Sequence, residues 1–419
     1  MTKGLKKNKG FLTLIVAQVI SGIGDWLSIV AIITLVGLKW NASPLEVSFI
    51  FLCLAVPMAL FGPVAGVVAD RFNRKALMVT SDLIRAGLIL ILTVADTVWV
   101  VYLCLFTVGI FSALFIPAKN GKLKELVSDD YMKSAMSISS MIDSSTKVIG
   151  PLLSGVLVAS FGPKLVFYID SATFFVAGLI ILFLPKTVQA INPTSQISKK
   201  KNSFKTEFTI GFSFIKTNTF LLVGMLYFGI GLLLIQLADS QLIVLIRELT
   251  SASPDLFGYL LTLSGVGMFS AGLLLAKKTD YDTYPIMLIG ILGLGLSFGS
   301  MVAFTNYDVG FSIIWMPLFG FLAGFSYSLV SVPFHSSVQI NTPVHLTGRV
   351  FGVINSVATT ATIIGPLLGG WLSTIIGVIP AFIISSSLLV SLALIGALYR
   401  SKIDKASKGE SQEGAYKLN

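Results

Sequence analysis

Charge is scarce in this sequence. Only 12% of its 419 residues are Asp, Glu, Lys or Arg, whereas a soluble domain carries about 25%. At the same time 54% of the residues are hydrophobic, so a folded form in water would expose far more apolar surface than soluble proteins do. These proportions exclude a water-soluble globular protein. They indicate that the lipid bilayer is the solvent for most of the chain.

Cysteine and histidine are scarce as well. Cys53 and Cys104 both fall in apolar runs, which disfavours a disulfide or a metal site. His335 and His345 flank one predicted loop without metal-type ligands beside them. The sequence also has no phosphate-binding Gly-x-x-x-x-Gly-Lys loop and no recognisable catalytic set. We therefore expect no enzyme, no metal site, no cofactor and no direct use of ATP.

Long hydrophobic runs dominate the chain instead. A membrane-spanning helix needs about 20 mostly apolar residues. In lipid every peptide group must be hydrogen-bonded within its own segment, so such runs are predicted to be helices. The first run is too long for a cleavable signal peptide. The prediction is an all-α membrane protein with twelve transmembrane helices at residues 11–38, 46–69, 76–95, 98–118, 134–161, 165–185, 219–246, 255–276, 284–304, 309–334, 349–376 and 379–399.

Nearly all Lys and Arg fall on one side of the predicted membrane. The opposite side has only Lys39, Lys164 and Arg247. Cytosolic loops are the positively charged loops of membrane proteins, so we predict a multi-pass protein with both termini in the cytosol. The net charge of +10 is then a topological signal rather than a nucleic-acid-binding surface.

One long polar segment, residues 186–218, divides the spans six and six. Aromatic and aliphatic residues recur at helical spacing between 204 and 215, which predicts an amphipathic helix on the cytosolic membrane surface. The expected organisation is a six-helix bundle over residues 1–185, a cytosolic central loop over 186–218, a second six-helix bundle over 219–400 and a cytosolic tail over 401–419.

An internal repeat relates the two halves. Residues 149–155 read I-G-P-L-L-S-G, and residues 364–370 read I-G-P-L-L-G-G, at an offset of 215 residues. Proline bends a helix and glycine lets two helices approach closely. We therefore predict two pseudo-symmetric bundles around a central path. The predicted hinge residues are Gly150, Pro151, Gly155, Gly365, Pro366 and Gly369.

A short charged loop lies between the second and third predicted helices. Residues 62–75 read G-P-V-A-G-V-V-A-D-R-F-N-R-K. A plain hairpin with topological charges would not need Asp70 at the helix end, four residues after Gly66. The segment resembles the signature loop of the major facilitator superfamily, G-x-x-x-D-R-x-G-R-K. This resemblance implies a secondary transporter with that family's twelve-helix fold.

The resemblance gives the loop the role of a cytosolic gate. Gly66 would allow close helix packing, Asp70 would face the amino end of a helix, and Arg74 would pair with Asp82, Asp129 or Asp130. Such contacts would hold the two halves together on the cytosolic side and would break in the inward-open state. Asn73 replaces the usual glycine and is expected to keep the turn, because Asn tolerates a left-handed backbone. The gating set is Gly62, Gly66, Asp70, Arg71, Asn73, Arg74 and Lys75.

Ionisable residues inside a span are functional candidates. Asp25 lies near the middle of the first span, after the small residues Ser21, Gly22 and Gly24. It could bind and release a proton as access to the site alternates, or it could be a structural carboxylate that caps a neighbouring helix. The residues leave both interpretations open.

Two further pairs are spaced for contact along one helix. Asp82 with Arg85 and Asp143 with Lys147 are three and four residues apart, so each is expected to form an ion pair. The first pair favours a structural role, and the second is deep enough to line the path. Asp25, Asp143 and Asp239 are the candidate proton sites. The candidate substrate-lining residues are Gln18, Trp26, Gln236, Trp315 and Asn355.

Other stretches are similar to one bacterial branch of this superfamily, the macrolide-efflux and siderophore-exporter types of drug:proton antiporter. The Gly-Pro copy at 150–155 resembles the antiporter motif, with Ser154 where a second glycine is common. The branch implies a monomer that exports amphipathic, drug-like molecules across the bacterial cytoplasmic membrane, driven by proton entry. The remaining matching stretches are Gly24-Asp25, Ser81-Asp82-Leu83-Ile84-Arg85-Ala86, Phe115-Ile116-Pro117-Ala118-Lys119, Glu125-Leu126-Val127, Phe167-Tyr168-Ile169-Asp170-Ser171-Ala172 and Gly211-Phe212-Ser213-Phe214-Ile215-Lys216.

The alternatives to this function are another cargo and a role without transport. A siderophore exporter or a lysophospholipid flippase would keep the fold and change the cargo, and lipid cargo would need a lateral opening. A receptor or scaffold would need a sizeable soluble domain or a long tail, whereas the predicted tail after Arg400 is short.

Overall fold

The computed structural model describes residues 5, 7–185, 204–250, 255–277, 281–343 and 346–416. All regular structure in these ranges is helical. The helices are α2 (Lys9–Ile33) with its π-helical continuation η1 (Thr34–Lys39), α3 (Pro44–Arg71), α4 (Arg74–Ile91) with the short turn η2 (Leu92–Val94), α5 (Val98–Leu126), α6 (Asp129–Phe161), α7 (Pro163–Leu182), α8 (Phe204–Thr217), α9 (Thr219–Asp239), α10 (Leu242–Arg247), α11 (Leu256–Lys277), α12 (Thr283–Asn306), α13 (Ser312–Asn341), α14 (Thr347–Ile376) and α15 (Val378–Tyr416).

Local sequence signals set several of these boundaries. Ser43 and Glu46 form a capping box at the start of α3, and Pro44 occupies the first helical turn. The turn from α6 to α7 passes through Gly162 at φ +78°, and the turn from α14 to α15 passes through Gly377 at φ +90°. Both need a backbone conformation that glycine adopts easily. These two turns lie at the same offset of 215 residues as the Gly-Pro repeat.

Eleven helices in the described ranges are long and apolar enough to cross a bilayer. For the predicted fifth span, the apolar stretch found among the described residues of α6 is shorter, Leu152–Phe161. With 33 residues, α6 is nevertheless about 50 Å long at the usual helical rise. The count of twelve spans therefore stays a prediction, while the all-helical membrane fold is confirmed.

The seventh predicted span agrees with Thr219–Arg247, within which the helix is interrupted at Ser240–Gln241 and divided into α9 and α10. The last predicted span agrees with Val378–Leu398, and helix α15 continues beyond it to Tyr416. One predicted boundary was wrong, because the fourth helix accommodates Pro117 and continues to Leu126 rather than ending at 118. The amphipathic helix is present as α8.

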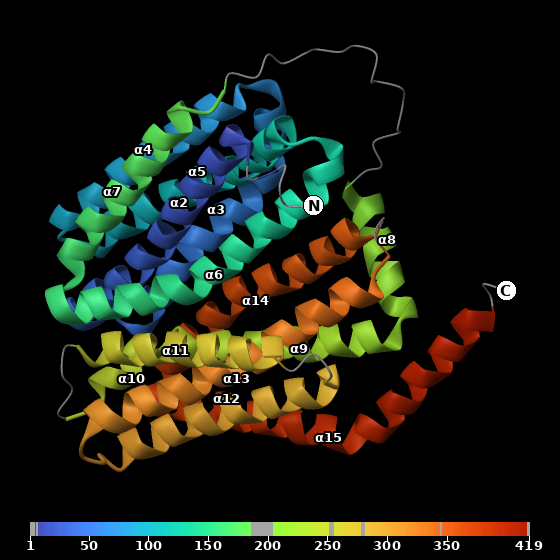
Figure 1. Ribbon diagram of the computed structural model, residues 1–419. Coiled ribbons are helices and arrows are strands. Elements are labelled where there is room, and N and C mark those ends of the chain that lie inside the picture. Colours follow the sequence, from blue (N-terminus) through green and yellow to red (C-terminus); the bar gives the residue numbers. More distant parts are fainter. Residues whose placement is uncertain are drawn as a thin grey trace.

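The helices form two bundles that repeat one packing scheme (Figure 1). In the first bundle α2 packs against α6 and α7, and α3 against α5. In the second bundle α9 packs against α14 and α15, and α11 against α13. Helices α3 and α6 of the first bundle contact α14 and α11 of the second. Helix α8 lies against α14 and α9.

The molecule has two ends along the helix axes. The end that carries residues 70–75 and α8 is called the loop end. In Figure 1 helix α8 lies at the right, as does the end of α15. The far end is opposite, where α6 meets α7 and where α3 begins. The charge pattern of the sequence predicts that the loop end faces the cytosol.

Candidate functional site

Arg85 lies at the centre of an ion network inside the first bundle. Its Nη1 is 3.1 Å from Oδ1 of Asp25 on α2, and its Nη2 contacts Oδ1 of Asp82 on its own helix α4. The side chains of Arg85 and Asp82 are 2% and 0% exposed, whereas that of Asp25 is 47% exposed. The predicted Asp82–Arg85 pair is therefore present, and Asp25 is the member of the network that solvent can reach.

Two aromatic rings enclose the guanidinium of Arg85. It lies 4.7 Å from the ring centroid of Phe115 on α5 and 4.4 Å from that of Phe174 on α7. Cation–π contacts of this kind are worth about 2 kcal/mol when they are shielded from water. Together with the two carboxylates, the rings fix the position of the charge within the bilayer.

A further carboxylate, Asp170 on α7, belongs to the same region and was missed as a site residue. It is fully buried and accepts hydrogen bonds from Ser28 on α2 and, at 3.2 Å, from Thr173. It approaches α2 at Gly24, where a Cβ would lie 2.4 Å from its Oδ1. The glycine directly before Asp25 was the sequence signal for this close contact.

A second polar cluster surrounds Asp143 on α6. Its Oδ1 accepts a hydrogen bond from Nε2 of Gln18 on α2 at 2.7 Å, and Nζ of Lys119 on α5 lies 3.4 Å away. Gln18 also exchanges two hydrogen bonds with Ser139. The expected partner, Lys147, has a side chain outside the described residues. Lys119 was predicted to lie in a cytosolic loop, but the longer α5 buries it beside Asp143.

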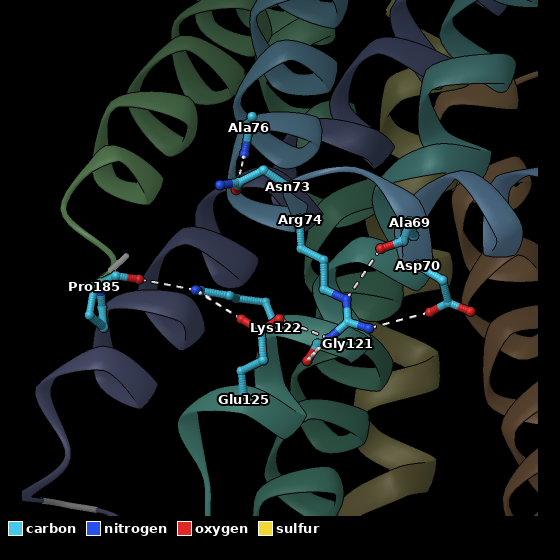
Figure 2. Close-up of polar contacts among 9 residues, drawn as sticks. All are labelled: Ala69, Asp70, Asn73, Arg74, Ala76, Gly121, Lys122, Glu125 and Pro185. Atoms are coloured by element: carbon cyan, nitrogen blue, oxygen red, sulfur yellow. Dashed lines mark hydrogen bonds and ion pairs between the residues drawn. The ribbon is translucent and has the colours of Figure 1, made fainter. Parts of the chain in front are cut away.

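Arg74 links three helix ends of the first bundle (Figure 2). It bonds to Oε1 of Glu125 at 2.8 Å and to Oδ1 of Asp70 at 3.3 Å, and its guanidinium also reaches the carbonyl oxygens of Ala69 and Gly121. The expectation that Asp82 is its partner was wrong, because Asp82 lies inside the bundle on Arg85. The side chains of Asp129 and Asp130 lie outside the described residues.

Lys75 and Asn73 stabilise helix ends. Nζ of Lys75 donates to the carbonyls of Leu182 and Leu184, at the carboxyl end of α7 where a positive charge is favoured. Asn73 caps α4 by accepting a hydrogen bond from the backbone amide of Ala76 at 3.1 Å (Figure 2). Its φ of −63° shows that the expected left-handed conformation was wrong. Asparagine serves here as an N-cap residue.

The glycines of the loop motif face open space in this conformation. A Cβ at Gly62 or Gly66 would meet no atom within 4 Å, and the same holds for Gly352 on α14. Arg71 is exposed, as is Asp70, whose side chain is 66% exposed. The contacts of Arg74 and Lys75 described above lie within the first bundle, so the expected bridge from the loop to the other half stays a prediction.

Hydrogen bonds join the two bundles at the far end instead. The hydroxyl of Ser48 on α3 donates to the carbonyl of Pro366 on α14 at 2.6 Å. Nε2 of the fully buried Gln241, which follows α9, donates to Oγ of Ser48 at 2.9 Å and to the carbonyl of Pro44 at 3.3 Å. A Cβ at Gly370 would lie 2.2 Å from Oγ of Ser48, so the helices are in close contact.

The Gly-Pro repeat places equivalent residues in equivalent contacts. Gly150 packs against Trp26 on α2, and Gly365 packs against Gln236 on α9. Gly155 then touches Gly258 of the second bundle, just as Gly370 touches Ser48 of the first. The two copies differ at one position, where Ser154 stands in the first copy and Gly369 in the second. The hydroxyl of Ser154 donates a hydrogen bond to the carbonyl of Leu27 at 2.6 Å. Gly369 packs directly on the carbonyl of Leu237, whereas the side chain of Pro151 lies outside the described residues.

The candidate lining residues separate into two groups. Gln18 is buried in the Asp143 cluster, and Trp315 is buried between Phe304 and Phe319 with its Nε1 bonded to the carbonyl of Val309. The expectation that Trp315 lines a path was therefore wrong. Asn355 and Asp239 are exposed, while Trp26 and Gln236 are half-buried. The contacts between Trp26 and Gly150 and between Gln236 and Gly365 are helix-packing contacts.

Comparison with known proteins is consistent along the whole chain. The sequence matches the Major Facilitator Superfamily over residues 14–358 and 230–418. It is 38% identical over 398 residues to the uncharacterized MFS-type transporter YfiS of Bacillus subtilis (strain 168), with 94% of each chain covered. It is 26% identical over 409 residues to macrolide efflux protein A of Streptococcus pyogenes, covering 92% of this chain and 94% of the relative. The solved structure of the nucleoside transporter NupG has a TM-score of 0.69 at 13% identity, over 93% of this chain and 98% of that chain, which shows a shared fold.

Proposed function

The chain belongs to the major facilitator superfamily of membrane transporters, and we propose that it exports amphipathic, drug-like molecules by proton-coupled alternating access. Macrolides are the substrate class that its relative in Streptococcus pyogenes suggests. The proposed location is the cytoplasmic membrane of a bacterium, with the loop end in the cytosol and no cofactor besides the proton gradient.

The observation that carries this proposal is the state of Asp25. A carboxylate within a membrane span is costly unless it has a role or a partner. Asp25 pairs with the buried Arg85, and 47% of its side chain is exposed. A group that is both paired and accessible can exchange a proton with water and can pass the change in charge to a buried residue. Asp82 and Asp170 are fully buried and lack this access.

Contacts between the bundles support alternating access. At the far end Ser48, Gln241 and Gly370 close the interface, whereas Gly66 and Gly352 at the loop end face open space. With the loop end in the cytosol, this arrangement is an inward-open state that can receive a substrate from the cell. Export then requires the far-end contacts to break and the small residues at the loop end to come together.

Inverted membrane vesicles test the proposal. Respiration acidifies their interior, and a pH-sensitive dye reports the gradient after addition of a macrolide, a cationic dye or a lysolipid. We expect a macrolide or the dye to dissipate the gradient with wild type but not with Asp25→Asn. Asp96→Asn is the matched control, because Asp96 is exposed between η2 and α5 and should behave as wild type.

Two results would contradict the proposal. If no compound dissipates the gradient and lysolipid moves independently of it, proton-coupled export is wrong and a lipid carrier replaces it. If Asp25→Asn transports as wild type at equal abundance, Asp25 has no part in coupling.

A further inference from the structure

Four buried polar atoms close to Arg85 have no hydrogen-bond partner among the described residues. They are Oγ of Ser21, Oγ of Ser81, Oδ2 of Asp82 and Nε of Arg85. None of the four residues is more than 2% exposed. An unpaired buried polar atom costs about 1–3 kcal/mol. Four of them in one region therefore indicate a small polar occupant rather than a packing fault.

One of these atoms belongs to α2 and the other three belong to α4. Arg85 is three residues after Asp82 and four residues after Ser81, so its side chain neighbours both on the surface of α4. Ser21 on α2 lies beside the Asp82 carboxylate, although no hydrogen bond of normal geometry joins them. Asp25 stands one turn further along α2 and contacts the same guanidinium. Arg85 thus separates an accessible carboxylate from a buried one.

The surrounding charges favour the uptake of a proton. Asp170 on α7 is also close enough to interact electrostatically with Asp25 and Arg85. Lys119 on α5 is bonded to Asp143 on α6. Arg85 is therefore the main cation for three carboxylates, Asp25, Asp82 and Asp170. Two uncompensated negative charges in a low-dielectric interior are strongly unfavourable, and one bound proton removes part of that cost.

We propose that Ser21, Ser81, Asp82 and Nε of Arg85 enclose a hydrated pocket in which Asp82 is a second proton-binding site, reached through Asp25. The proposal rests on the proposed function and adds a buried proton store to it. Buried water typically makes about three hydrogen bonds, and the two hydroxyls, the carboxylate oxygen and the Nε–H supply suitable partners. The predicted structural pair Asp82–Arg85 thereby acquires a functional part.

The proton moves in two steps that leave no atom unaccounted for. A hydronium ion protonates Asp25, which forms one O–H bond and releases one water molecule. The O–H of Asp25 then donates its proton to pocket water while that water gives a proton to Oδ2 of Asp82. Asp82 is now neutral, and Asp25 is again a carboxylate that pairs with Arg85.

Infrared difference spectroscopy on the purified protein in lipid tests this pocket with protons alone as the probe. A downward pH jump should produce C=O bands of protonated carboxylic acids. We expect Asp82→Asn to remove one such band, Asp25→Asn to slow its appearance at least tenfold, and Asp96→Asn to change nothing. If Asp82→Asn leaves every acid band in place, the proposal is wrong.

Ser21→Ala covers the case in which Asp82→Asn does not fold. This variant keeps all charges and removes one lining hydroxyl, so the hydrated pocket predicts a shifted Asp82 band. An unchanged band overturns the proposal. The spectrum needs no substrate, so the two proposals fail separately. A titrating Asp82 in a protein without drug-driven proton flux would reject the proposed function alone, and drug-driven flux without the Asp82 band would reject the pocket alone.

Discussion

The hydroxyl of Ser48 on α3 donates a hydrogen bond to the carbonyl oxygen of Pro366 on α14, across 2.6 Å between the two bundles. Gln241 reinforces this contact from the break between α9 and α10. The Gly-Pro repeat therefore does more than bend a helix, because its second copy presents a carbonyl group to the other half of the molecule. These hydrogen bonds, together with the packing of α3 on α14 and of α6 on α11, join the two bundles and must separate at the far end if access alternates.

A side chain at Gly370 should open the far end. In Gly370→Leu the new Cβ would lie 2.2 Å from Oγ of Ser48 and 2.9 Å from the carbonyl oxygen of Pro44, so α3 and α14 must move apart. Spin labels at Lys39 and Tyr307, in a background with both native cysteines replaced by serine, measure the distance between the bundles at this end. We expect a longer distance in Gly370→Leu than in the parent.

Gly352→Leu is the matched control for this experiment. It lies on the same helix but faces open space, so it should leave the distance at the far end unchanged. Labels at Arg71 and Lys277 should instead report that it prevents closure of the loop end when substrate and a proton gradient are present. An unchanged distance between Lys39 and Tyr307 in folded Gly370→Leu would show that these contacts do not set the conformation.

Arg85→Lys should impair both stability and coupling. A guanidinium can reach Asp25 and Asp82 through separate nitrogens and stack on two rings, whereas an ammonium is a single point charge. We expect a lower Tm in detergent and a drug-driven proton flux reduced at least tenfold. Arg247→Lys, in α10 and outside both the gating set and the ion network, should match wild type in both measurements. Equal activity of Arg85→Lys and wild type would show that one positive charge suffices.

Arg74 should be coupled more strongly to Glu125 than to Asp70. The Glu125 side chain is 19% exposed and lies 2.8 Å away, whereas Asp70 is 66% exposed at 3.3 Å. Exposed ion pairs are worth about 0.2–1 kcal/mol. In double-mutant cycles of unfolding free energy, we expect Arg74 with Glu125 near the upper end of that range and Arg74 with Asp70 near zero. A stronger coupling to Asp70 than to Glu125 would show that burial and distance do not rank these two ion pairs.

Local spacing was enough to predict part of the site. The ion pair of Asp82 with Arg85 could be predicted because the two residues are three positions apart on one helix. The repeat at residues 150 and 365 predicted equivalent helix contacts in the two bundles. Apolar residues at helical spacing predicted the amphipathic α8, which lies between the two bundles in sequence. These features depend on periodicity, which a sequence displays directly.

Contacts between helices could not be predicted in the same way. The contact of Asp25 with Arg85 depends on how α2 and α4 are placed in the bundle. The spacing of residues along the chain does not indicate how two separate helices are aligned. Lys119 was misplaced because the apolar run ends at residue 118, although α5 continues beyond it and turns the lysine inward. The partner of Arg74 was misjudged because Glu125 lies 51 residues later on another helix.

Active transport by the purified protein tests the central claim most directly. Proteoliposomes with a pH gradient as the only energy source should accumulate a radiolabelled macrolide against its concentration gradient, and a protonophore should abolish this accumulation. We expect wild type and Asp96→Asn to accumulate the macrolide and Asp25→Asn only to equilibrate it. Accumulation by Asp25→Asn equal to that of wild type, or equilibration by wild type whatever the gradient, would contradict proton-coupled export through Asp25.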